Sequence, residues 1–108
     1  MIGEILCDVE RAVNYELTRI KLNHGEKYHT WHEAYGVLAE ELYEVQREKT
    51  VMDDLDSGMV CAMHRNDDDT LKLIYDRIAG CAIRAACELI QVAAVCRKAL
   101  GGVEVQDS

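Results

Sequence analysis

Residues 71–100 carry apolar side chains at helical spacing on two opposite faces, and this pattern constrains the fold more than any other in the chain. One stripe comprises Ile74, Ile78, Cys81, Ala85, Leu89 and Val92, and the opposite stripe comprises Ala79, Ile83, Ala86, Ile90 and Ala94. A helix of this length reaches roughly 45 Å, and both of its apolar faces must be covered. One short chain has few elements with which to cover them, so the pattern predicts self-association.

The remaining sequence also predicts helices. Apolar spacing indicates a first helix over about residues 2–22, ended by Gly25. Thr30 and Glu33 fit a capping box at the start of a second helix. This helix is expected to end near residues 49–50. Within residues 51–70, the sequence pattern predicts a brief helix followed by a polar turn. The turn ends in an N-cap residue for the last helix. Because proline is absent, we expect an all-α bundle of three to four helices, completed by homo-oligomerisation. We expect one domain over residues 1–102 and a flexible tail over residues 103–108.

The second helix places a carboxylate inside its own apolar stripe. Ala34, Val37, Leu38, Leu42 and Val45 fall within an arc of roughly 140°, and Glu41 projects near the centre of that arc. Glu44 lies one turn on, at the edge. Glu88 repeats the pattern on the first stripe of residues 71–100. An unpaired buried carboxylate is very costly, so each position requires a partner, a proton or a metal ion.

Two interpretations of these acids stay open. Glu41 and Glu44 lie on adjoining turns and can share one divalent ion with Glu88, and such an all-oxygen set suits Mg²⁺ or Mn²⁺ rather than zinc. Alternatively, Glu44 is a surface residue, and Glu41 and Glu88 pair with basic side chains, for which Arg84 has the right spacing. Glu16, in the apolar stripe of the first helix, presents the same choice between an acidic site and a basic partner.

Two longer stretches resemble one protein family. Residues 32–45 (HEAYGVLAEELYEV) and 88–94 (ELIQVAA) are similar to the two acidic helices of the MazG-like nucleotide pyrophosphohydrolases, which are all-α enzymes related to dimeric dUTPases. The pattern of that family is ExxE followed downstream by ExxD. Glu41 and Glu44 match the first pair, and Glu88 matches the first position of the second pair. Gln91 stands where the family has its final Asp, and 43 residues separate the two motifs.

The resemblance implies a Mg²⁺-dependent pyrophosphohydrolase (Mn²⁺ as the substitute) that converts a nucleoside triphosphate to the monophosphate and pyrophosphate. It implies metal-binding and catalytic roles for Glu41, Glu44 and Glu88. Gln91 becomes a substrate-binding residue or a weak ligand, since an amide oxygen coordinates Mg²⁺ less strongly than a carboxylate. The alternative is a helical protein that kept the fold but lost turnover, and that binds nucleotide or serves in assembly. The implied partners are the nucleotide and a second copy, as homodimer or homotetramer.

Composition and sequence patterns disfavour several other classes of protein. With 12 basic and 20 acidic residues and a net charge of −8, the chain is a poor candidate for binding duplex nucleic acid. The beginning of the sequence does not resemble a signal peptide, and no run of 18 apolar residues predicts a membrane span. Five cysteines without CxxC spacing are typical of a reducing compartment, so we expect a cytoplasmic protein.

Two weaker patterns have ordinary interpretations as well. His29, His32 and Glu33 have a spacing that zinc sites use, although capping already accounts for Glu33. Tyr28, Trp31, Tyr35 and Tyr43 offer rings that stack on a nucleobase, but at helical spacing packing is the default role.

Overall fold

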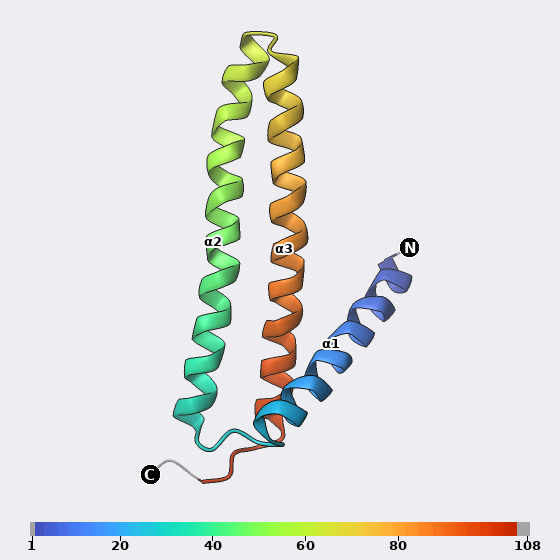
Figure 1. The fold of residues 1–108 in the computed structure, drawn as a ribbon, viewed down its shortest axis with the longest axis vertical. Helices are drawn as coiled ribbons and strands as arrows, with labels where there is room; N and C mark the ends of the chain where they lie inside the picture. Colours follow the sequence, from blue (N-terminus) through green and yellow to red (C-terminus); the bar gives the residue numbers. More distant parts are fainter. Residues whose placement is uncertain (1, 106–108) are drawn as a thin grey trace.

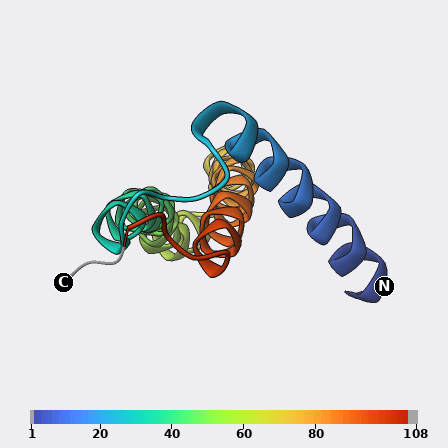
Figure 2. The ribbon, with the colours of Figure 1, turned by 90° about the horizontal axis from the view of Figure 1, so that it is seen from below.

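The computed structural model describes residues 2–105, which form three helices: α1 (Ile2–His24), α2 (Trp31–His64) and α3 (Asp68–Leu100). The expected all-α class is therefore confirmed. Helices α2 and α3 form a long antiparallel hairpin, and α1 runs obliquely back along one end of α3 (Figure 1). Seen from below, the N-terminal half of α1 projects away from the hairpin (Figure 2).

Local signals mark the helix ends. The Thr30 hydroxyl accepts a hydrogen bond from Glu33 N at 3.2 Å, as the capping box predicts, while the Glu33 carboxylate accepts from His29 N, one residue earlier than expected. Gly25 ends α1 with φ +92°, a left-handed conformation that suits glycine. Asp67 caps α3, because its side chain accepts from Thr70 N.

The second helix is much longer than the sequence indicated. It does not end near residues 49–50 but continues to His64. The prediction of a separate brief helix within residues 51–70 was therefore wrong. The reason lies in packing. The less exposed positions of α2 alternate in steps of three and four residues: 38, 41, 45, 48, 52, 55, 59 and 62. Those of α3 do the same: 71, 74, 78, 81, 85, 88, 92 and 95. This heptad pattern joins the two helices as an antiparallel coiled coil.

The molecule is too extended to cover its own apolar surface. Its radius of gyration is 18.4 Å, against about 13 Å for a compact chain of this length. Its accessible surface is 7818 Å², whereas a compact protein of this mass exposes roughly 6,100 Å². On α3, Ala79, Ile83 and Ala86 are exposed, so three of the five residues of the second apolar stripe are uncovered. On α1, Ile2 and Ile5 are also exposed.

The segment after α3 is docked. Val103 forms a parallel bridge with Tyr28, Glu104 N donates to Tyr28 O at 2.9 Å, and Val105 N donates to His29 O at 2.8 Å. Val103 is buried with Tyr28 and Val95 in the main hydrophobic cluster. Residues 103–105 therefore differ from the flexible tail predicted for them, because pairing with the loop before α2 holds them. Residues 106–108 lie outside the described residues.

Helix α3 is long and apolar enough to cross a bilayer, judged by length and composition alone. An 18-residue window within it has a mean hydropathy of 1.6, and 17% of that window is buried. Near its middle, however, α3 carries Arg84 and Glu88, and a charge at the centre of a spanning helix costs about 3 kcal/mol. The core helix of a soluble assembly passes the same test, so the expected absence of a membrane span stays a prediction.

Candidate functional site

Two of the predicted acids meet across the hairpin. Glu41 of α2 and Glu88 of α3 both occupy the seam of the coiled coil, where each is partly buried. Burial is the largest cause that raises the pKa of Glu41 to about 6, followed by a hydrogen bond with Glu88 and the negative charges of Glu88, Glu44 and Glu40. Such an acid pair is costly unless a proton or a cation joins it.

In the described part of the chain, no basic side chain forms an ion pair with these two acids. Within residues 2–105, neither Glu41 nor Glu88 forms an ion pair with Lys or Arg. Arg84, the candidate partner for Glu88, instead places its Nε 3.1 Å from Glu48 Oε1 on α2. The interpretation of Glu41 and Glu88 as members of ordinary salt bridges is therefore wrong for the described part of the chain.

The four predicted site residues line two neighbouring cavities. Glu41 and Gln91 line the larger one, of about 320 Å³, which we call the junction cavity because all three helices contribute to it. Glu44 and Glu88 line the other, of about 190 Å³, which Arg47 and Arg84 also border. The acid pair thus joins the two cavities, and the structure does not bring Glu44 to the same point as Glu41 and Glu88.

The Glu41–Glu88 pair could hold a metal ion only together with water or substrate oxygens. Over residues 2–105, no three His, Cys, Asp or Glu side chains converge closely enough to hold a metal by themselves, which also argues against the zinc pattern at His29 and His32. Mg²⁺, however, keeps several waters and is commonly bound through one or two carboxylates plus substrate phosphates. The Glu41–Glu88 pair meets that smaller requirement, and burial is the largest cause of the raised pKa of Glu41.

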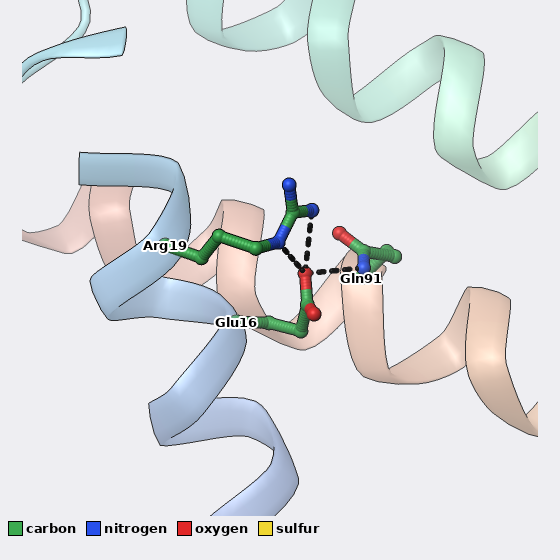
Figure 3. Close-up of polar contacts among 3 residues, drawn as sticks. All are labelled: Glu16, Arg19 and Gln91. Carbon is green, nitrogen blue, oxygen red and sulfur yellow. Dashed lines mark hydrogen bonds and ion pairs between the residues drawn. The ribbon is translucent and has the colours of Figure 1, made fainter. Parts of the chain in front are cut away.

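Gln91 is held by a residue of α1 (Figure 3). Its Nε2 donates to Glu16 Oε2 at 2.6 Å, and the same oxygen accepts from Arg19 Nε at 3.0 Å and Nη2 at 2.7 Å. The Arg19 hydrogen bond, and then that of Gln91, lower the pKa of Glu16. Of the two interpretations of Glu16, pairing with a basic residue is the one observed. Gln91 links α1 to α3 beside the acid pair.

The contact between Gln91 and Glu16 changes what an acid at position 91 is expected to do. We predict that Gln91→Asp destabilises the metal-free protein at pH 7 by about 1–3 kcal/mol, because an aspartate cannot donate to Glu16 and adds a like charge beside it. Urea unfolding in EDTA measures the effect. Adding Glu16→Gln to Gln91→Asp restores a donor–acceptor pair and should recover most of the loss. Unchanged stability of the single variant would contradict the observed contact.

The structure also reveals a buried basic residue that the sequence did not indicate, Lys98, and places it beside Tyr28. Lys98 and Tyr28 are buried and line the junction cavity, with Arg19 and His24 of α1 at its border. In sequence, Arg97 and Lys98 are the basic last turn expected of any helix, which gives no sign of burial. Of the four aromatic residues considered for stacking, Tyr28 is buried, while Trp31, Tyr35 and Tyr43 are exposed.

Comparison of the chain with protein-family models, with curated proteins and with solved structures found no match in any of the three. The arguments about function therefore rest on the residues and on the geometry of this site.

Proposed function

We propose that the chain is a Mg²⁺-dependent nucleoside triphosphate pyrophosphohydrolase. The observation that carries the proposal is the Glu41–Glu88 pair, which comes from two facing helices, lacks a basic partner among residues 2–105 and borders two cavities. Perturbed carboxylates in a concave site are typical of functional centres. The ExxE pattern at Glu41 and Glu44 and the ELIQVAA stretch at Glu88 add the likeness to MazG-like enzymes.

The reaction adds water across the bond between the α-phosphorus and the oxygen that bridges to the β-phosphate. A bond forms from the water oxygen to the α-phosphorus, the bridging bond breaks, and a water proton passes to a base. A bound Mg²⁺ would cancel charge on the phosphates. Glu41 and Glu88 would hold that ion, with Glu44 one turn away. One carboxylate of the acidic site that does not hold the ion would orient the attacking water or accept its proton.

A second candidate function is a helical protein without turnover that binds nucleotide or assembles with copies of itself. The Gln91 contact favours it, because the amide in the position of the family's final Asp is already engaged by Glu16 at 2.6 Å. The uncovered apolar stripe of α3 also favours an assembly role. The acid pair is the reason to prefer the enzyme, since assembly alone does not require two carboxylates in a helical seam.

The direct test is pyrophosphate release from a panel of canonical and modified nucleoside triphosphates, with Mg²⁺, with Mn²⁺ and with EDTA. We expect metal-dependent release from at least one nucleotide. Absence of release from the whole panel, by protein shown to be folded, would reject the enzyme and favour the second candidate.

We further propose the setting in which the site operates. All five cysteines, each within residues 2–105, are free thiols, which supports a reducing cytoplasm. The excess accessible surface of one chain, about 1,700 Å², exceeds the roughly 800 Å² that each partner buries in a standard stable interface, and it supports a homodimer or homotetramer. The net charge of −8 disfavours duplex nucleic acid as a partner, and no membrane is required.

A further inference from the structure

Lys98 is a buried basic residue that has no ionic partner among residues 2–105. Its residue is 1% exposed, and its Nζ lies 4.1 Å from the centroid of the Tyr28 ring. Across residues 2–105, it forms no ion pair and no hydrogen bond. A cation–π contact offsets only part of the loss of hydration of an ammonium group. The position therefore calls for an anion that the described chain does not supply.

A second unused group lies beside it. Tyr28 is 4% exposed, and its hydroxyl is buried with no hydrogen-bond partner within residues 2–105. Burial, then the charges of Glu33, Cys96 and Glu41, raise the pKa of Tyr28, so the hydroxyl keeps its proton and can donate. Buried hydroxyls are nearly always hydrogen-bonded. The Lys98 ammonium has donors only, so it cannot accept a hydrogen bond from the Tyr28 hydroxyl. Both groups therefore require an acceptor from elsewhere.

Both groups line the junction cavity, whose other end holds Gln91 and Glu41. Lys98 and Gln91 are seven residues apart on α3, which corresponds to roughly 10 Å along the helix. Arg19 and His24 add basic groups at the border, and Glu33 adds a carboxylate that is already held by His29 N. The cavity thus has Glu41 and Gln91 in its lining, and the buried Lys98 lies about two turns further along α3.

We propose that the Lys98 end of the junction cavity binds a phosphate group, with the Lys98 ammonium and the Tyr28 hydroxyl as donors. A phosphate satisfies both donors and supplies the missing negative charge, whereas the carbonyl of a nucleobase supplies no charge. In a nucleotide, the phosphate chain would run from the Glu41–Glu88 pair toward Lys98, which places the departing pyrophosphate at Lys98. That placement rests on the proposed function, whereas phosphate binding at Lys98 does not.

Calorimetric titration with inorganic pyrophosphate, in EDTA so that no metal ion bridges, tests the site. We expect Lys98→Met, which keeps the length of the side chain, to weaken binding at least tenfold, and Tyr28→Phe to weaken it several-fold. Lys72→Met, at an exposed position of α3, is the matched control and should bind like the wild type. Lys98→Met removes an unpaired buried charge, so its thermal stability should equal or exceed that of the wild type. Equal affinity of Lys98→Met and wild type, or no binding by the wild type, overturns the proposal.

A second titration, with a non-hydrolysable nucleoside triphosphate and Mg²⁺, separates the two sources of phosphate. Loss of nucleotide affinity in Lys98→Met indicates the phosphate chain of a nucleotide, and a loss confined to pyrophosphate indicates the free anion. The outcomes also separate the two proposals. Binding that depends on Lys98 without any turnover rejects the enzyme but keeps the site. If Lys98→Met turns over nucleotide with the KM of the wild type and binds pyrophosphate equally well, the proposal of an enzyme is kept and the phosphate site at Lys98 is rejected.

Discussion

Replacing Glu41 with glutamine is expected to abolish pyrophosphate release and, at the same time, to make the metal-free protein more stable at pH 7.5. Glu41 is the seam residue with the raised pKa, and the substitution removes its charge with little change of shape. Losing a general base, or the carboxylate that would hold the ion, lowers kcat by about 10²–10⁴-fold. Initial rates of pyrophosphate release at saturating nucleotide and Mg²⁺ measure this part of the prediction.

The gain in stability follows from the sign of the pKa shift. Because the pKa of Glu41 is about 6 in the folded protein and 4.5 in the reference state, the folded protein binds its proton more tightly. Below pH 4.5 the residue is protonated in both states, so its charge has no cost. The cost grows as the pH rises from 4.5 to 6, where the unfolded chain has lost the proton and the folded protein still holds it, and it levels off at about 2 kcal/mol above pH 6. Glu41→Gln should therefore raise the Tm by several degrees at pH 7.5 and by nothing at pH 4.

Thermal unfolding in EDTA, at one protein concentration and across this pH range, provides the measurement. Glu10→Gln, which makes the same chemical change at an exposed position of α1, is the control and should change neither rate nor Tm. A Glu41→Gln protein that is less stable than the wild type at pH 7.5 would show that the carboxylate has a favourable partner in the assembled protein. Saturating Mg²⁺ should stabilise the wild type more than the variant.

Replacing Ile83 with glutamate is expected to dissociate the protein into a poorly folded monomer. Ile83 is 67% exposed in the single chain and lies in the uncovered part of the second stripe of α3. In a monomer this change would be nearly neutral, since exposed substitutions away from special features change stability by less than about 0.5 kcal/mol. Inside an apolar interface between copies, an unpaired carboxylate costs several kcal/mol.

Light scattering after size exclusion measures the assembly. The wild type should have at least twice the 12.2 kDa mass of the chain, and Ile83→Glu should shift toward the mass of the single chain. Its Tm should fall by more than about 8 °C, which corresponds to a loss of roughly 2 kcal/mol in a domain of this size. Gln46→Glu adds the same charge at an exposed polar position of α2 and should leave mass and Tm unchanged. A monomeric, stable wild type would contradict the prediction.

The first and last helices and the start of the second could be read from the sequence, because caps and apolar spacing act over a few residues. Thr30 and Glu33 located the start of α2. Its continuation through residues 51–64 could not be read, because Asp53, Ser57 and Gly58 individually disfavour helix. Packing of Met52, Leu55, Met59 and Ala62 against α3 overrides those local preferences.

Within the candidate site, the sequence by itself determined which carboxylates lie on apolar stripes, because the stripe of a helix depends only on its period of 3.6 residues. It therefore indicated Glu41 and Glu88. Only the tertiary structure decided that these two acids meet, that Glu16 engages Gln91, and that Lys98 and Tyr28 are buried together, with no ion pair for Lys98 and no hydrogen-bond partner for the Tyr28 hydroxyl within residues 2–105. Each of these facts depends on which helices lie side by side, and residues 75 positions apart, such as Glu16 and Gln91, have no local pattern that reveals their contact.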